Sequence, residues 1–306
     1  MNIHVAYAPR LWSHLQLARP PNVVTALADV LAGFAATGLL TSSIELTAAP
    51  ALTTVGWLLM ATVGLYAGGV VFNDVFDAEL DQLERPERSI PSGRVSRDSA
   101  ALFGVVLLLG GVLAATQVSG FSAVLAAALA LTALIYDAYG KHLPALGPLN
   151  MGVCRGLNLL LGMSGLPAAV TELWFIALIP IVYIAAITSV SRGEVHGGNH
   201  RTGVMALLLI VTVSIGVLAL AWLQSFQMLF AVPFLLLFWW RIVPPYVRAA
   251  RDPRADRVRV AVQVGVVNLI VLNASIAAGF AGLWYGLMVL LLLPISAGLA
   301  RLFAVT

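Results

Sequence analysis

Long apolar runs recur along almost the whole chain, and they restrict its fold more than any other feature. A helix of about 20 apolar residues crosses the roughly 30 Å hydrocarbon core of a bilayer. Lipid offers the backbone no hydrogen-bond partners, which favours helices over open sheets. We therefore predict an all-α polytopic membrane protein, with nine to ten transmembrane helices in a single domain over residues 1–306. The predicted helices are 22–41, 51–73, 98–118, 121–138, 148–166, 172–190, 203–222, 225–243, 259–280 and 283–303.

The distribution of charge predicts the orientation of these helices. Hydrophobic residues make up 60% of the chain and charged residues only 10%, far from the balance of a soluble domain. If ten helices alternate in direction, all 17 Lys and Arg except Arg155 fall on one side of the membrane. The opposite connections carry Glu45 and Glu172 and no basic residue. By the positive-inside rule, both termini should be cytoplasmic.

Several classes of protein are excluded by what the sequence lacks. The pI of about 9.3 follows from membrane topology, and no basic patch interleaved with aromatic residues indicates nucleic-acid binding. The single Cys154 excludes a disulfide framework and a cysteine-based metal site. No phosphate-binding glycine loop of an ATP-driven pump occurs. We expect no cleaved signal peptide, and we interpret residues 1–21 as an amphipathic segment at the membrane surface.

The stretch FNDVFDAELDQLERPERSIPSGR, residues 72–94, concentrates acidic side chains at the end of the second apolar run. Asn73, Asp77 and Asp81 are spaced by four, so a continuing helix would place them on one face, with Asp74 beside them. Carboxylates this close repel one another unless a cation lies among them. Several oxygen ligands together suit Mg²⁺, which often binds one or two carboxylates and substrate phosphates.

Basic side chains follow the acidic ones directly. Arg85, Arg88 and Arg94 would supply hydrogen-bond donors to phosphate oxygens that a metal leaves free. The alternative is a solvated loop whose charges pair with one another, which accounts for Glu79 and Glu84. That alternative does not account for a charged run that begins inside the helix. We therefore favour a site that binds metal and phosphate.

These residues resemble a known family. Asn73-Asp74-x-x-Asp77-x-x-x-Asp81, followed by RPERSIPSGRVS, resembles the first aspartate-rich motif of the UbiA superfamily of intramembrane prenyltransferases. ARPPNVVTALADVLAG resembles the first helix of that family, and YDAYGKHLPALGPLNMGVCRG resembles its segment with a tyrosine five residues before a lysine. The resemblance covers residues 18–205. It implies a helical bundle around a central cavity, capped on the cytoplasmic side by two Asp-rich loops.

The resemblance also implies a reaction. Two Mg²⁺ ions would hold an isoprenyl diphosphate, its allylic C–O bond would break, and a small cyclic acceptor would trap the carbocation. An apolar chamber would protect that cation from water. By this resemblance the metal ligands are Asn73, Asp74, Asp77, Asp81 and Glu194. The four carboxylates among them, Asp74, Asp77, Asp81 and Glu194, would act in catalysis together with Lys141. The diphosphate would be bound by Arg88, Arg94 and Lys141. Lys141 has an alternative interpretation as a topological anchor.

The second motif of the family is altered in this chain. Where the family carries D-x-x-x-D, the sequence reads SRGEVHGGNHRTG, so Glu194 stands for the first aspartate and Gly198 leaves the second position vacant. Either a second metal binds weakly, with Arg192, His196 and Arg201 binding phosphate directly, or prenyl transfer is impaired. If Glu194 is the surviving carboxylate of a two-metal site, Gly198→Asp should tighten metal binding. If the loop instead binds phosphate through His196 and Arg201, Gly198→Asp should weaken binding. The sequence SRGEVHGG in this loop resembles that of the UbiA-like EboC proteins of bacterial Ebo gene clusters.

Polar residues also lie inside the predicted helices, where ionisable groups usually face the interior or a cavity. We infer that Asp29 and Arg155 line the acceptor side of the chamber, with a purely structural ion pair as the equal alternative. The residues predicted to contact substrate from within the membrane are Asn22, Tyr136, Arg155 and Asn158.

Two classes of function remain open at this point. The first is a Mg²⁺-dependent prenyltransferase acting on an isoprenyl diphosphate and a small cyclic acceptor. The second is a non-catalytic lipid-binding protein or a transporter that takes part in making or exporting a secondary metabolite, and the altered second motif favours it. In either case we predict an integral protein of a bacterial inner (plasma) membrane.

Overall fold

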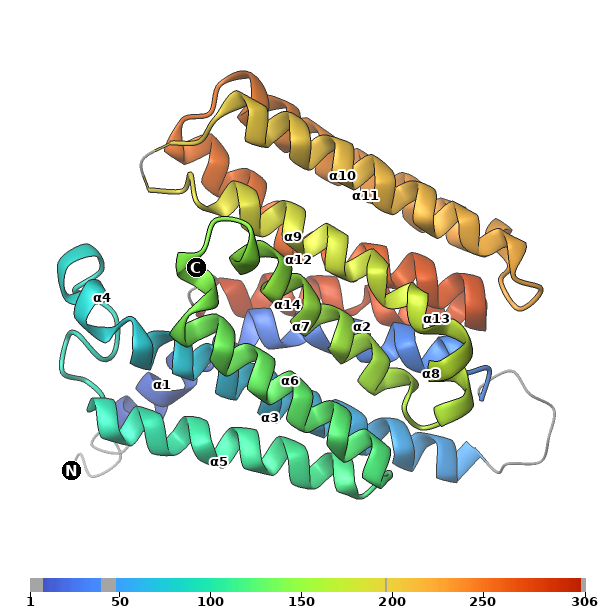
Figure 1. Cartoon of the computed structure of the whole chain (residues 1–306), viewed down its shortest axis with the longest axis horizontal. Coiled ribbons are helices and arrows are strands. Elements are labelled where there is room, and N and C mark those ends of the chain that lie inside the picture. The colour runs from blue at the N-terminus through green and yellow to red at the C-terminus, as the bar shows by residue number, and fades with distance from the viewer. Residues whose placement is uncertain (1–7, 40–47, 196, 304–306) are drawn as a thin grey trace, which may run out of the picture.

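The computed structural model describes residues 8–39, 48–195 and 197–303, and all the regular structure in these ranges is helical. Figure 1 shows long helices side by side, running back and forth between two ends of one bundle. The first half contains α1 (Ala8–Leu17), α2 (Pro20–Ala36), α3 (Ala48–Phe76), α4 (Ala78–Glu84), α5 (Arg97–Thr116), α6 (Gly120–Ala138) and the short 3-10 helix η1 (Gly140–His142). The second half contains α7 (Leu146–Met163), α8 (Pro167–Leu173), η2 (Trp174–Ala177), α9 (Leu178–Ser191), α10 (His200–Ala219), η3 (Leu220–Trp222), α11 (Met228–Arg251), α12 (Ala255–Ala281), α13 (Leu283–Leu290) and α14 (Leu292–Ala300).

The prediction of an all-α membrane bundle is confirmed. Each of the predicted apolar segments overlaps at least one of these helices. Within the part of the chain that the structure describes, eight helices are long and apolar enough to cross a membrane, by length and composition. The apolar helix α2 is shorter, with 17 residues. The chain is therefore an integral membrane protein.

The helices extend further than the apolar runs predicted. Helix α3 continues to Phe76 and α11 continues to Arg251. The hydrogen bonds between backbone N–H and C=O groups within a helix form equally well in lipid and at its surface, so a helix need not end where the apolar run ends. The predicted helix 172–190 is divided into α8, η2 and α9. Pro180 lacks an N–H group, so the carbonyl of Ile176 loses its α-helical partner where the chain changes to a 3-10 turn.

Glycine allows two pairs of helices to approach closely. A Cβ atom at Gly162 of α7 would lie 2.3 Å from the carbonyl oxygen of Val30 on α2. A Cβ atom at Gly64 of α3 would lie 2.5 Å from the carbonyl oxygen of Leu107 on α5. Small residues commonly mediate such contacts inside membranes, where helix association depends on close packing. These contacts fix α7 against α2 and α5 against α3.

The surface and the centre of the bundle differ as expected for a protein in lipid. Large apolar side chains such as Leu109, Leu208 and Leu236 are exposed on α5, α10 and α11. Helix α12 lies in the centre, and 72% of its most apolar 18-residue stretch is buried. Exposed apolar side chains cost no free energy where the surrounding medium is hydrocarbon.

The connections rich in Lys and Arg lie at one end of the bundle. Figure 1 shows α1, α4 and the connections α9–α10 and α11–α12 at the left end. The connections α10–α11 and α12–α13, which carry no charged residue, lie at the right end. We refer to the left end as the basic end, and the positive-inside rule predicts that it faces the cytoplasm.

The contact between α2 and α7 generates a test of the fold. Gly162→Ala should lower the free energy of unfolding by about 1–3 kcal/mol, because the added methyl group collides with backbone atoms that cannot move independently. Thermal or denaturant unfolding in detergent measures this change. Gly110→Ala on α5 is the matched control, since a Cβ atom there meets nothing within 4 Å. Equal effects of the two substitutions would contradict the close α2–α7 contact.

Candidate active site

A charged cavity of about 670 Å³ opens at the basic end of the bundle. Gln16 of α1 and Arg19, which directly precedes α2, form one part of its wall, and the segment from the end of α3 to Arg94 forms another. The α9–α10 connection and the first turns of α12 complete it. Its charged lining residues are Arg19, Asp74, Glu84, Arg85, Glu87, Arg88, Arg94, Glu194 and Arg259.

The first aspartate-rich motif lies at the junction of α3 and α4. The helical hydrogen bonds continue through this junction, from Asp77 N–H to Asn73 O and from Asp81 N–H to Asp77 O. The spacing predicted from the sequence is therefore present. The side chains nevertheless do not converge, and the described residues contain no group of three His, Cys, Asp or Glu that could hold a metal ion.

Each aspartate of the motif has a basic partner instead. Asp74 Oδ1 accepts a hydrogen bond from Arg19 Nη2 at 2.6 Å. Arg88 Nη1 lies 2.7 Å from Asp81 Oδ2 and 3.4 Å from Asp74 Oδ1. Lys141 Nζ lies 2.6 Å from Asp77 Oδ1. These side chains are mostly buried, so the pairs are much less screened than exposed ones.

The alternative of a loop paired within itself therefore holds only in part. The partner of Asp81, Arg88, comes from the same segment, as that alternative expects. Arg19 and Lys141 instead come from distant parts of the chain. The motif is thus the meeting point of α1, α3, α4 and η1 at the basic end.

Two charged groups in the cavity are only partly compensated. Among the residues that the structure describes, Glu194 Oε1 is buried without a hydrogen-bond partner. Burial raises the pKa of Glu194, while the nearby Arg85 and Arg259 lower it. Burial and the neighbouring Arg88 and Arg19 together lower the pKa of Arg85. Guanidinium groups gathered in this way favour a bound anion.

An inner cavity of about 260 Å³ lies deeper in the bundle, between α2, α3, α6 and α7. Apolar side chains such as Leu65, Val70 and Met151 form much of its wall. The polar residues that line it are Arg19, Asn22, Tyr66, Asn73, Tyr136, Asp137, Arg155 and Asn158. Arg19 lines both cavities, so the two meet at its side chain.

The wall of the inner cavity contains a hydrogen bond that links the motif to α6. Asn73 Nδ2 donates a hydrogen bond to Asp137 Oδ1 at 3.0 Å. Because the amide nitrogen is used in this way, the amide oxygen of Asn73 stays available to another ligand. Asp137 is therefore a candidate positioning residue that the sequence did not single out for substrate contact.

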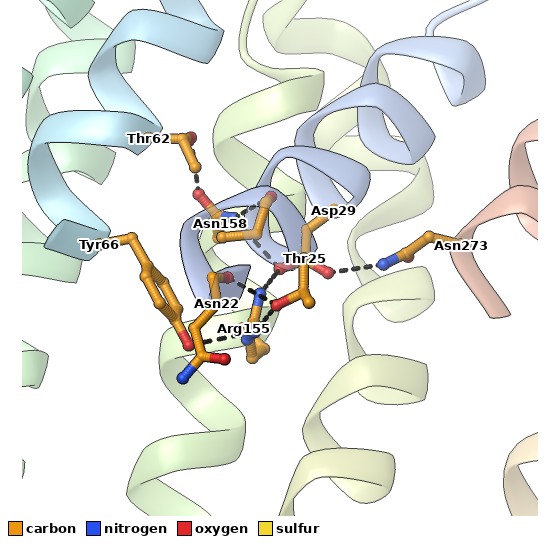
Figure 2. Close-up of polar contacts among 9 residues, drawn as sticks. Asn22, Thr25, Asp29, Thr62, Tyr66, Arg155, Asn158 and Asn273 are labelled. Carbon is orange, nitrogen blue, oxygen red and sulfur yellow. Dashed lines mark hydrogen bonds and ion pairs between the residues drawn. The ribbon is translucent and has the colours of Figure 1, made fainter. Parts of the chain in front are cut away.

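A buried network joins the inner cavity to the core of the bundle (Figure 2). Asp29 is fully buried on α2. Its Oδ2 accepts hydrogen bonds from Arg155 Nη1 at 2.9 Å and Asn158 Nδ2 at 3.1 Å. Its Oδ1 accepts a hydrogen bond from Asn273 Nδ2 at 2.6 Å. One carboxylate thus connects α2, α7 and α12.

The network continues from α7 to α3. Arg155 Nη2 donates to Thr25 Oγ1 at 2.6 Å and to the hydroxyl of Tyr66 at 3.2 Å. Thr62 Oγ1 donates to Asn158 Oδ1 at 2.8 Å. Asp29 and Arg155 thus form the ion pair that the structural alternative expects. Arg155 and Asn158 also line the inner cavity, whereas Asp29 lies behind them.

Comparison with known proteins agrees with this architecture. The sequence profile of the UbiA prenyltransferase family matches residues 30–262. The chain belongs to the UbiA prenyltransferase family. A similar protein is the digeranylgeranylglyceryl phosphate synthase of Methanothrix thermoacetophila, 32% identical over 193 residues that cover 63% of this chain and 67% of that one. The synthase of the same name from Methanoculleus marisnigri is 31% identical over 205 residues, covering 65% and 68%.

Solved UbiA structures share the fold. The apo UbiA homologue from Aeropyrum pernix K1 superposes with a TM-score of 0.65 at 16% identity, covering 83% of this chain and 96% of that one. The UbiA homologue from Archaeoglobus fulgidus bound to DMAPP and Mg²⁺ superposes with a TM-score of 0.56 at 14% identity, covering 95% and 100%. The predicted superfamily is confirmed, and membership of the EboC branch stays a prediction.

The altered second loop of this UbiA protein contributes less to the cavity than the sequence suggested. Arg192 Nη2 donates to the carbonyl oxygens of Lys141 and Leu143, at 3.2 and 2.7 Å, and so supports η1. Arg201 is exposed and lines neither of the two cavities. His196 lies outside the described residues. Glu194 does line the charged cavity.

Gly198 faces away from the charged cavity. A Cβ atom there would lie 3.2 Å from Val258 Cγ2 and 3.6 Å from Pro253 Cβ. Gly198 lines a separate cavity of about 280 Å³ behind the loop. An aspartate at this position would therefore not reach the first motif, and the second carboxylate of the family has no equivalent in this geometry.

The basic residues that replace it in the charged cavity come from elsewhere. Arg259 enters from the second turn of α12, and Arg85 follows α4 directly. The place of Arg259 in the cavity could not be predicted from the sequence, because it depends on how α12 packs. Arg19 lies in ARPPNVVTALADVLAG, the stretch that resembles the first family helix, and that position is the signal by which it could be found.

The charged cavity offers oxygen ligands of the kind that Mg²⁺ prefers. Asp74 and Glu194 line it, and Asn73 lines the neighbouring inner cavity. The buried Glu194 Oε1 in particular lacks a hydrogen-bond donor among the described residues. Glu194 is the single carboxylate that the second loop contributes to the charged cavity.

The Asp29 network predicts a large effect on stability. Asp29→Ala should lower the free energy of unfolding by about 3–5 kcal/mol, because Arg155 would be left buried without its counter-charge. Unfolding in detergent, followed by circular dichroism, measures this loss. The double variant Asp29→Leu, Arg155→Met should recover much of it, since neither charge is then buried. A double variant less stable than Asp29→Ala would contradict this account.

The second loop gives a prediction about metal binding. Glu194→Gln should weaken Mg²⁺ binding, by at least the roughly 10-fold that loss of an outer ligand partner costs. Gly198→Asp should leave Mg²⁺ affinity unchanged, because its side chain would face Val258 and Pro253. Titration calorimetry with MgCl₂ and inorganic diphosphate measures both. Tighter Mg²⁺ binding by the folded Gly198→Asp variant would contradict this geometry and support the overlay made from sequence.

Proposed function

We propose that this UbiA-family protein is a Mg²⁺-dependent enzyme that transfers an isoprenyl group from its diphosphate to an acceptor within the membrane. One observation carries the proposal: a charged cavity at the membrane surface meets an inner cavity at Arg19. An isoprenyl diphosphate has the same two-part character, with a highly charged head and an apolar tail. The family membership supports the same reaction class.

The charged cavity is suited to the diphosphate. Arg85, Arg88 and Arg94 line it and can donate hydrogen bonds to phosphate oxygens. Lys141 holds Asp77, so its role at the diphosphate includes positioning that carboxylate. Asn73, Asp74, Asp77 and Glu194 would hold Mg²⁺, which when bound neutralises charge on the leaving diphosphate.

The inner cavity is suited to the carbocation and its acceptor. When the allylic C–O bond breaks, the electron pair leaves with the diphosphate and positive charge remains on carbon. The mostly apolar wall limits access of water, which would otherwise quench that cation. Tyr136, Asn22 and Asn158 line the same space and can orient a polar acceptor.

Two kinds of acceptor have specific support. The relatives named digeranylgeranylglyceryl phosphate synthase support an acceptor that carries glyceryl phosphate, and we take this as the first candidate. The small cyclic acceptor predicted from the sequence is the second. It is supported by the inner cavity. There Asp29 already neutralises the charge of Arg155, so Arg155 does not need the phosphate of an acceptor as its counter-ion.

The proposal is tested with purified protein in detergent or nanodiscs. We expect Mg²⁺-dependent release of diphosphate from geranylgeranyl diphosphate when geranylgeranylglyceryl phosphate is added, with the prenylated product identified by mass spectrometry. Parallel reactions with shorter isoprenyl diphosphates and with 4-hydroxybenzoate test the cyclic acceptor. If diphosphate is bound but never released in any combination, the non-catalytic lipid-binding or transport function replaces this one.

The first motif provides a matched pair of variants. Asp77→Asn should weaken Mg²⁺-dependent diphosphate binding by at least the roughly 10-fold expected for a perturbed metal site, because a ligand charge is lost and Lys141 loses its partner. Glu79→Gln is the control, since Glu79 lies on the same segment but is exposed and pairs with Arg97 at 3.5 Å, outside the cavities. Equal binding by wild type and Asp77→Asn would contradict the metal assignment.

A further inference from the structure

Arg19 occupies a special position between the two cavities. It follows α1 and directly precedes α2, and it lines both the charged cavity and the inner cavity. Among the lining residues of these two cavities, it is the one they share. In the proposed reaction, the bond between diphosphate and prenyl carbon must lie at this boundary.

The backbone of Arg19 adopts a conformation that side-chain-bearing residues seldom use. Its φ of 44° and ψ of 66° lie in the left-handed region, and it has the only positive φ among non-glycine residues in the described ranges. Pro20 disfavours the right-handed helical region for the residue before it. Hydrogen bonds from Arg19 N to Gln16 O and from Asn22 N to Arg19 O fix both sides. Backbone strain of this kind is often found at functional sites.

The guanidinium of Arg19 uses the same carboxylate that a metal ion would need. Arg19 Nη2 lies 2.6 Å from Asp74 Oδ1, and only 15% and 8% of the two side chains are exposed. Arg88 Nη1 approaches the same oxygen at 3.4 Å. A divalent cation bound to Asp74 would repel both guanidinium groups at this distance. Metal and arginine therefore compete for Asp74.

We propose that Arg19 is an exchangeable counter-ion, which neutralises Asp74 until substrate arrives and then moves to the diphosphate when Asp74 binds Mg²⁺. The exchange keeps both charges compensated throughout, and it places a donor at the oxygen next to the breaking bond. Arg88 is less suited to this role, because it is held by Asp81 at 2.7 Å and lines the charged cavity alone. This inference rests on the proposed function.

The exchange predicts how the affinities for Mg²⁺ and for diphosphate depend on each other. Mg²⁺ alone must displace Arg19 from Asp74, and diphosphate alone finds Arg19 already engaged, so each ligand should bind weakly without the other. When both are present, the displaced guanidinium gains a new partner. Mg²⁺ and diphosphate should therefore bind cooperatively, and a coupling of about 5- to 150-fold would be typical.

Arg19→Gln tests the exchange, because glutamine keeps a side chain on the left-handed backbone and removes the charge. Titration calorimetry on the full chain in detergent would use MgCl₂ alone, and then inorganic diphosphate at saturating Mg²⁺. We expect Arg19→Gln to bind Mg²⁺ alone about tenfold more tightly, and to bind diphosphate about tenfold less tightly. The two effects have opposite signs, which a purely structural role of Arg19 would not produce.

Two further variants complete the experiment. Arg19→Lys keeps the charge and should stay close to wild type in both titrations. Arg97→Gln removes an exposed arginine that pairs with Glu79 outside the cavities, and it should change neither affinity. Unfolding curves in the same detergent show that each variant is folded.

The outcomes separate this inference from the proposed function. If Arg19→Gln weakens both affinities, or changes neither, the exchange is overturned while the transferase proposal stands. If the wild type binds Mg²⁺ but no diphosphate in its presence, the proposed function fails, and the exchange fails with it. Tighter Mg²⁺ binding together with weaker diphosphate binding supports both.

Discussion

The buried carboxylate of Asp29 is the interaction on which the rest of the structure depends. Taking the guanidinium of Arg155 out of water would be prohibitive without a counter-charge in contact with it. Because Asp29 also accepts hydrogen bonds from Asn158 and Asn273, the same group sets the positions of α2, α7 and α12 relative to one another. Thr62 then ties α3 to Asn158, and α3 carries the first aspartate-rich motif. One network thus holds in place both the cavity-lining residues Arg155 and Asn158 and the helix that carries the first motif.

The two cavities divide the physical problem that an amphiphilic diphosphate presents. A diphosphate needs many hydrogen-bond donors and counter-ions, and such charged groups cost least free energy near water. A carbocation reacts with water and needs an environment that excludes it. The bundle separates these environments along its length. Acidic and basic groups at the basic end compensate one another, so the cavity holds a high density of charge without a large net field. The proposed enzyme and the non-catalytic alternative share this architecture and differ in whether the C–O bond breaks.

The sequence was sufficient for the membrane bundle, because each apolar run is a local feature whose length matches a bilayer. It also located the first motif, since Asn73, Asp77 and Asp81 keep their helical spacing in the structure. It could not predict which charges pair, because Arg19 and Lys141 reach Asp74 and Asp77 only after distant helices have packed. The sequence overlay at Gly198 also left its geometry open, because an alignment gives the order of residues in a loop, whereas the direction of each Cβ depends on the backbone of the loop.

The last helices have a consequence for where this fold begins and ends. The match to the family profile stops at residue 262, yet Asn273 lies beyond it and donates to Asp29, and Ser296 of α14 donates to the carbonyl oxygen of Pro21. The two extremes of the described chain therefore close on each other around the first membrane helix. A chain that ended at residue 262 would therefore lack two of the groups that hold α2 in place, the donor to Asp29 and the donor to the carbonyl oxygen of Pro21.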